Sequence, residues 1–143
     1  MANERDQERR SNCPISAALE VLGDRWSLLI VRDMMFGGAR SYKELMSSAE
    51  GIASNILASR LTTLEAQGIL TGVRDPSDGR RFIYRLTAKG VELAPVLLEL
   101  SRWGTRFEAG QPPAGLLEAW QREPDALLAG LRRKLLQAEP SET

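Results

Sequence analysis

The sequence contains no histidine and a single cysteine, Cys13. Without histidine there is no Ser-His or Cys-His nucleophile pair, no imidazole base and no histidine-ligated zinc. One cysteine cannot form an intrachain disulfide or a thiolate zinc site. A G-x-G-x-x-G or phosphate-binding loop is also lacking. Because most routes to catalysis are closed, the sequence predicts a protein that is not an enzyme and that needs no metal or cofactor.

Long apolar runs and a net charge are lacking as well. No run approaches the roughly 20 apolar residues of a membrane span, and the polar segment 1–12 has no signal-peptide core. We therefore expect 1–12 to be a disordered lead-in and the protein to be cytoplasmic. The 143 residues carry 19 basic and 19 acidic side chains. Residues 54–89 nevertheless hold more Arg and Lys than Asp and Glu, and a local basic excess can mark a DNA-binding surface.

Two helices are predicted in the first quarter of the chain. Pro14 suits the first position of one helix, which Gly23 ends. Asp24 can cap a second helix over 25–36, where apolar residues recur at helical spacing. Trp26 on this helix is expected to pack in the core; the alternative is the wall of an effector pocket.

A helix-turn-helix motif is predicted next. Ser41 and Glu44 form a capping box that starts a third helix, and a short turn leads to a fourth, which ends at Gly68. Wound at about 100° per residue, the fourth helix has a leucine stripe on one face and small residues on the other. Two short helices joined by a tight turn are the layout of a helix-turn-helix, with the second as recognition helix. The stripe is Leu57, Leu61 and Leu64, and the small face is Asn55, Ala58, Ser59 and Thr62.

A β-hairpin is predicted directly after the recognition helix. Residues 69–74 and 81–86 are rich in strand formers, and residues 75–80 between them are dense in turn formers. A helix-turn-helix followed by a hairpin is the plan of a winged helix. Asp78 is expected to hold Arg80 or Arg81 of this wing in place.

A long helix over 88–107, capped by Thr87, is predicted to follow the wing. Pro95 must kink it, because proline has no backbone N–H to donate. Its apolar stripe is longer than a small winged domain needs, so we predict a subunit interface. The members of this stripe are Leu93, Val96, Leu97, Leu100, Trp103 and Phe107.

The rest of the chain is predicted to be a linker over 108–115 and amphipathic helices. The last helix, over 125–138, is expected either to fold back on the dimer or to pack on a partner, in preference to a membrane surface. The predicted divisions are the lead-in 1–12, a winged helix-turn-helix domain with its dimerisation helix over 13–108, and the linker with C-terminal amphipathic helices over 109–143.

Several segments together resemble the HxlR-type bacterial transcriptional regulators. The run "NCPISAALEVLGDRWSLLIVRDM" is similar to the start of that family, and "ARSYKELM" is similar to its Arg-aromatic-x-Glu-Leu segment. Residues 51–70, "YRLTAKG" and Trp103 extend the resemblance over roughly 12–107. Where the family often has a capping serine this chain has Ala53, so we expect Ser54 to take over the cap. The wing "DPSDGRRFIYRLT" is more similar to that of MarR regulators.

The resemblance implies a mainly α fold with a small β-hairpin, a winged helix-turn-helix with C-terminal dimerisation helices. It implies a transcriptional regulator, most often a repressor, that binds double-stranded DNA as a homodimer at a pseudo-palindromic operator. The alternative function is a winged-helix protein-interaction module without DNA binding. Arg60 is expected to contact a phosphate or to form an internal ion pair.

In that context the small polar face of the recognition helix is expected to read base edges. The wing arginines are expected to reach the minor groove or phosphates. Two basic residues at the start of the third helix are also expected to contact phosphates. The DNA-binding candidates are Arg40, Lys43, Ser54, Asn55, Ala58, Ser59, Thr62, Arg80 and Arg81.

Cys13 stands at a helix N-terminus, where cysteines are often reactive. The resemblance implies that it is a candidate redox sensor, because relatives use a cysteine here to sense oxidants or electrophiles. The alternative is a small packing residue. A small-molecule effector is a further candidate partner.

Overall fold

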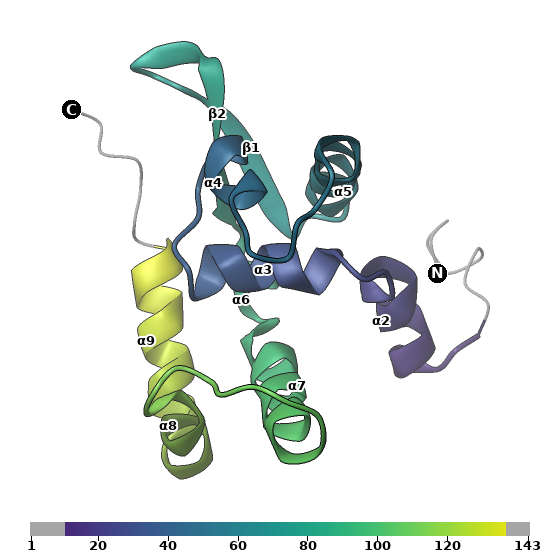
Figure 1. The fold of residues 1–143 in the computed structure, drawn as a ribbon, viewed down its shortest axis with the longest axis vertical. Coiled ribbons are helices and arrows are strands. Elements are labelled where there is room, and N and C mark those ends of the chain that lie inside the picture. Colours follow the sequence, from purple (N-terminus) through teal and green to yellow (C-terminus); the bar gives the residue numbers. More distant parts are fainter. Residues whose placement is uncertain (1–10, 137–143) are drawn as a thin grey trace.

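The computed structural model describes residues 11–136, so most of the expected lead-in, 1–10, and the last residues, 137–143, lie outside the described part. The described chain is mainly helical with one two-stranded sheet (Figure 1). This confirms the predicted fold class. The elements run in the order α2 (Pro14–Leu22), α3 (Ser27–Met35), α4 (Tyr42–Met46), α5 (Ser54–Ala66), β1 (Leu70–Asp75), β2 (Asp78–Leu86), α6 (Ala88–Val91), α7 (Ala94–Phe107), α8 (Leu116–Arg122) and α9 (Pro124–Leu136).

Helix α3 crosses the middle of the molecule, with the wing, α4 and α5 on one side and α7, α8 and α9 on the other (Figure 1). Its buried side chains join those of α5 and α7 in a single apolar core. The leucine stripe of α5 is buried as predicted. Trp26 is half-buried and packs against this core, as its first interpretation predicted. Burial of these apolar faces therefore orients the recognition helix and leaves its opposite face in solvent.

The predicted cap of α4 by Ser41 is confirmed, and the reciprocal bond to Glu44 comes from the residue before the cap. The Ser41 hydroxyl accepts a hydrogen bond from the Glu44 backbone N–H at 3.1 Å, and the Glu44 carboxylate accepts one from the Arg40 N–H at 3.3 Å. Helix α3, in contrast, begins at Ser27, two residues later than predicted. The Asp24 carboxylate still satisfies its first turn, because it accepts from the backbone N–H groups of Trp26 and Ser27, both at 2.9 Å.

Asp24 also ties α3 to the recognition helix. It accepts from the buried Ser27 hydroxyl at 2.5 Å and lies 3.7 Å from an Arg60 guanidinium nitrogen. Arg60 was expected to contact a phosphate or to form an internal ion pair, and in the structure it forms the ion pair. Burial raises the pKa of the Asp24 carboxyl, but the hydrogen bonds from Ser27 and Trp26 and the Arg60 charge outweigh it and hold the pKa below its usual value.

We expect Asp24→Ala to lower the free energy of unfolding by about 1–3 kcal/mol, because it leaves the buried Ser27 hydroxyl without its acceptor. The pKa of Asp24 is lower in the folded state, so its contribution is present above the unfolded-state pKa and is lost as pH falls through the folded-state value. Urea unfolding of both proteins from neutral pH downward should show the gap narrowing at acid pH. Asp24→Asn keeps an acceptor oxygen and should lose less; an equal loss at every pH would contradict a role for the charge.

The wing is an antiparallel hairpin whose register runs from Leu70 opposite Leu86 to Arg74 opposite Phe82. The predicted turn over 75–80 was too long: residues Asp78 to Arg80 belong to β2, and only two residues remain between the strands. The Asp75 carboxylate explains this tight turn, because it accepts from both the N–H and the hydroxyl of Ser77, at 2.9 and 2.7 Å.

The single helix predicted over 88–107 was wrong. Thr87 does cap its start, since its hydroxyl accepts from the Gly90 N–H at 3.1 Å, but α6 ends at Val91 and α7 begins at Ala94. Pro95 lies in the first turn of α7. A proline inside a continuous helix would clash with the carbonyl four residues earlier, so the chain breaks before it rather than kinking at it.

The C-terminal helices fold back on their own chain, whereas the last helix was expected to fold back on a dimer or to pack on a partner. Helix α9 lies against α6, β2 and α8, and its leucines pack half-buried against the core. Arg132 forms a two-pronged pair with Glu92, at 2.6 and 2.9 Å. No helix among the described residues is long and apolar enough to cross a membrane.

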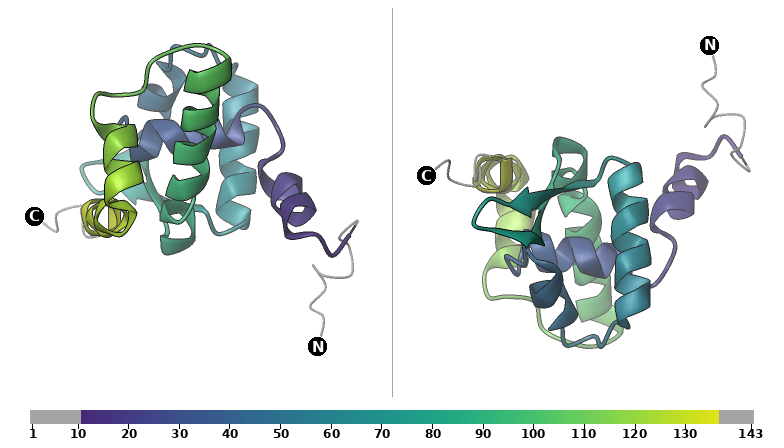
Figure 2. Two further views of the ribbon diagram at one scale, coloured as in Figure 1. Left: turned by 90° about the horizontal axis from the view of Figure 1, so that it is seen from below. Right: turned by 90° about the horizontal axis from the view of Figure 1, so that it is seen from above.

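Helix α2 stands apart from this arrangement. It projects from the body of the molecule (Figure 2) and has no buried residue. Ile15 and Leu19 on it are 72% and 59% exposed. A helix with such apolar side chains in solvent is typical of a surface that meets another protein.

Candidate DNA-binding interface

The outward face of α5 is made of small side chains. Asn55, Ala58, Ser59 and Thr62 are all exposed, as predicted from the helical spacing. The Thr62 hydroxyl donates to the Ala58 carbonyl at 3.0 Å, so its hydrogen is bound within the helix and its oxygen remains an acceptor. Without long side chains on this face, the helix backbone can approach a flat or grooved surface closely.

The first turn of α5 differs from the expectation. Ala53 is the N-cap residue and provides no side-chain cap, and Ser54 does not replace it. The hydroxyl of Ser54 instead shares a short hydrogen bond with the Tyr42 hydroxyl, which also donates to the Ser54 carbonyl at 2.8 Å. Tyr42 on α4 thus positions the start of the recognition helix, a role that the sequence analysis missed. Its aromatic ring in the helix-turn-helix was the available signal.

The wing carries Arg80 and Arg81, both exposed. Asp78 contacts Arg80 through the backbone, because its carboxylate accepts from the Arg80 backbone N–H at 3.1 Å. The Arg81 guanidinium lies 3.6 Å from Glu44 on α4. Arg74 was missed as a wing residue. It donates to the Gly79 carbonyl at 2.6 Å and lies over the Phe82 ring, so it stiffens the hairpin below its tip.

The structure brings Lys43 together with the wing arginines. A hollow of about 660 Å³ lies between α4 and the wing, and Lys43, Arg80 and Arg81 line it together with Tyr42. Arg40 lies elsewhere. It lines a smaller pocket with Arg85 and Lys134, on the side where α9 meets β2. The basic candidates therefore form two groups, one between α4 and the wing and one beside α9.

The stripe predicted as a subunit interface is partly buried within the chain. Leu97 is only 9% exposed and belongs to the core, and Leu93 is half-buried, so both face inward. Trp103 and Phe107 are 56% and 59% exposed, with ring centroids 5.6 Å apart. Val96 and Leu100 continue this exposed face, which forms a groove of about 840 Å³ flanked by arginines. The apolar surface left for a partner is thus Val96, Leu100, Trp103 and Phe107.

Cys13 is exposed, with a free thiol, at the N-cap of the projecting helix α2. Pro14 occupies the first helical position after it, as predicted. The Cys13 backbone N–H donates to the Ser11 hydroxyl at 3.2 Å. The thiol is therefore accessible to a reagent or to a second protein.

Comparison with known families decides between the two resemblances noted in the sequence. Residues 21–111 match the model of the HxlR-like helix-turn-helix family. The chain belongs to this family. The MarR-like features of its wing are a local departure, since the match runs through the wing and α7.

Relatives and solved structures agree with this assignment. The regulator sll1512 of Synechocystis is 34% identical over 93 residues, which are 65% of this chain and 68% of that protein. The transcriptional regulator YodB of Bacillus subtilis is 35% identical over 66% of this chain and 85% of its own. Its reduced form superposes with a TM-score of 0.56 at 33% identity, over 71% of this chain and all of that one, and it has also been solved diamide-treated and quinone-bound. PA1607, a candidate transcription factor, superposes with a TM-score of 0.65 at 36% identity, over 77% of this chain and 75% of that one.

This HxlR-like protein is a DNA-binding transcriptional regulator. Its family and its relatives are helix-turn-helix regulators rather than enzymes. The matched range ends at residue 111, so α8 and α9 lie beyond the part that the family model describes.

Proposed function

We propose that this regulator binds a pseudo-palindromic operator as a homodimer and represses transcription there. The observation that carries the proposal is the small polar face of α5, exposed beside the exposed arginines of the wing. A winged domain over 13–108 would supply the DNA and subunit contacts, and 109–143 would brace it. Two recognition helices about 34 Å apart would read successive major grooves.

Within the operator, the α5 face would contact bases. Asn55 pairs well with adenine, Ser59 and Thr62 can bond several base edges, and Ala58 can contact a thymine methyl group. The Tyr42 hydroxyl donates its one hydrogen to the Ser54 carbonyl, so the Ser54 hydroxyl donates to Tyr42 and would contact a base only as an acceptor. The wing residues Arg80 and Arg81 would neutralise phosphates or enter the minor groove, with Lys43 on the DNA backbone beside them. Arg40 would be a separate phosphate contact on the side of α9.

The homodimer would use the two exposed apolar faces outside the DNA-binding side. Helix α2 offers Ile15 and Leu19, and the α7 groove offers Trp103 and Phe107. Packing α2 of one protomer into the α7 groove of its partner would remove both from water, which is the main source of stability in such interfaces. Two-fold symmetry would form this contact twice, once at the α7 groove of each protomer.

A salt titration tests DNA binding against the alternative of a protein-interaction module. The DNA for this test is a duplex that the protein enriches from a pool of random sequences. We expect the logarithm of its association constant to fall linearly with the logarithm of the salt concentration, with a slope of about 0.9 for each neutralised phosphate. Fluorescence anisotropy at several salt concentrations measures this slope. A flat dependence, or no enrichment over unrelated duplexes, would overturn the DNA-binding proposal in favour of the interaction module.

Cys13 is the proposed redox sensor, supported by its exposure on the proposed subunit-contact helix and by the diamide-treated and quinone-bound forms of YodB. With one cysteine per chain, oxidation by diamide would join two Cys13 thiols of different protomers; diamide would take up the two protons and two electrons released. A quinone would instead add to one thiol. Either product would change how α2 meets its partner.

We expect diamide to release the wild-type protein from DNA and to leave the Cys13→Ser variant bound, because serine cannot form the disulfide. Anisotropy before and after treatment measures release, and non-reducing electrophoresis detects the linked dimer. The same response in both proteins would rule out Cys13 as the sensor.

A further inference from the structure

An apolar cavity of about 530 Å³ lies on the side of α3 away from the wing. Its walls come from α3, from α7 and from the linker and first turn of α8. Ligand pockets for small molecules are commonly about 300–1,000 Å³ and are lined mainly by apolar side chains. The lining residues are Leu28, Leu29, Arg32, Asp33, Phe36, Gly37, Leu97, Leu98, Leu100, Ser101, Pro113 and Leu116.

The part of the chain beyond the family match completes this cavity. Pro113 and Leu116 lie outside residues 21–111, so one wall belongs to the C-terminal extension. Helix α8 is held against α7 by a hydrogen bond of 2.7 Å from the Trp120 indole N–H to the Glu99 carboxylate. The cavity is therefore formed jointly by the winged domain and by the C-terminal extension that folds back on it.

The charges on the wall indicate a neutral ligand. The Arg32 guanidinium donates to Asp33 through Nε and Nη2, at 3.0 and 2.8 Å, and to Glu50 through Nη1, at 3.3 Å. Burial alone would lower the pKa of Arg32, but these two carboxylates outweigh it and raise the pKa. A charged ligand would lose its hydration on entering the cavity, and the charged groups there are already paired with each other. Its binding would therefore be unfavourable. Ser101 can give or accept one hydrogen bond.

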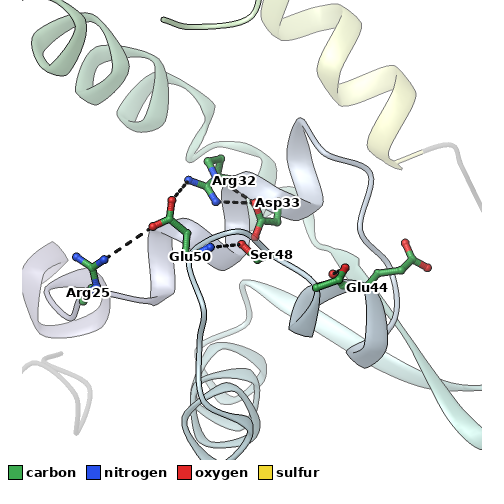
Figure 3. A network of polar contacts seen from close by, with 7 residues as sticks. Arg25, Arg32, Asp33, Glu44, Ser48 and Glu50 are labelled. Carbon is green, nitrogen blue, oxygen red and sulfur yellow. Dashed lines mark hydrogen bonds and ion pairs between the residues drawn. The ribbon is translucent and has the colours of Figure 1, made fainter. Parts of the chain in front are cut away.

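The same arginine connects the cavity to the recognition helix. Glu50, its second partner, lies in the turn between α4 and α5, where it also lies 3.8 Å from Arg25 (Figure 3). The Glu50 backbone N–H donates to the Ser48 hydroxyl within that turn. A molecule in the cavity that displaces the Arg32 side chain would weaken its pair with Glu50 and loosen the turn that precedes α5.

We propose that this cavity binds a neutral, largely apolar small molecule and that its occupancy weakens DNA binding through the Arg32–Glu50 pair. The binding half stands on the cavity alone. The regulatory half rests on the proposed function, because it requires that α5 contacts DNA.

The neutral dye N-phenyl-1-naphthylamine, which fluoresces in apolar surroundings, serves as the probe on the full chain without DNA. We expect saturable binding to the wild type and at least a tenfold loss in Ser101→Phe, whose ring protrudes into the cavity. We expect no loss in Thr105→Phe, one turn further along α7 and outside the lining. Leu116→Trp narrows the cavity from the α8 wall, and thermal unfolding shows which variants fold. Equal dye binding in the wild type and in either folded cavity variant would overturn the site.

The coupling is tested with DNA present. We expect saturating dye to lower the affinity of the wild type for its enriched duplex roughly fivefold or more, and to leave that of Glu50→Gln unchanged, although this variant still binds dye. An equal dye effect in both would overturn the Arg32–Glu50 route. Dye binding by a protein that does not bind DNA would keep the site and refute the proposed function, so the two failures are distinguishable.

Discussion

Replacing Trp103 with glutamate is expected to dissociate the proposed homodimer and to lower the affinity for a two-half-site operator at least about a hundredfold. A monomer loses the gain of holding two half-sites at once, which is about a hundredfold or more for linked sites. A carboxylate in the α7 groove would also have to be desolvated on dimerisation. Sedimentation and anisotropy on the full operator and on one half-site measure both effects.

Thr105→Glu is the matched control for this prediction. Thr105 is exposed on the same helix, at about 200° from Trp103 around the axis, and does not line the groove. It adds the same charge and should leave the dimer intact. Leu19→Glu on α2 should reproduce the Trp103→Glu result, because the proposed interface pairs these helices. A dimer that survives both changes would contradict the proposed α2–α7 contact.

The second large effect is expected from the double variant Asn55→Ala with Ser59→Ala on α5. Each good base contact contributes about 1–3 kcal/mol of discrimination, and a dimer makes every contact twice. We therefore expect a loss of roughly a hundredfold or more on the enriched duplex, with little change on unrelated duplexes. Competition binding with both duplexes measures the ratio.

The wing provides the opposite pattern as a control. Arg80→Ala with Arg81→Ala should weaken binding to both duplexes and lower the salt slope by about one for each phosphate that these arginines neutralise. The α5 variant should leave that slope unchanged. If the α5 variant weakened binding to all duplexes equally, the small polar face would be contacting the backbone and would not be reading sequence.

The sequence alone predicted the elements whose signals are local. The cap at Ser41, the leucine stripe of α5 and the cap at Thr87 each depend on residues within one or two helical turns, and all three are confirmed. The family resemblance followed from the same segments, because those side chains serve the shared core and helix-turn-helix. The sequence predicted that Pro95 disturbs the helix, but not whether the helix kinks at Pro95 or ends before it. Both arrangements accommodate a residue that has no backbone N–H to donate.

Partners far apart in the chain could not be predicted in this way. The pairing of Arg60 with Asp24, of Arg81 with Glu44 and of Arg32 with Glu50 spans 36, 37 and 18 positions, and a charged side chain gives no local sign of which partner it will meet. The same holds for Tyr42, whose hydroxyl reaches the start of α5 only because α4 packs beside it.

The small polar face of α5, the basic wing and the place of Cys13 at the start of α2 were determined by the sequence, because periodicity and turn chemistry act over a few residues. The tertiary structure decided which apolar residues remain available. Leu97 is buried in the chain's own core while Trp103 stays exposed, and the return of α8 onto α7 creates the cavity beside Arg32. Burial depends on what packs against a face, and that partner comes from elsewhere in the chain.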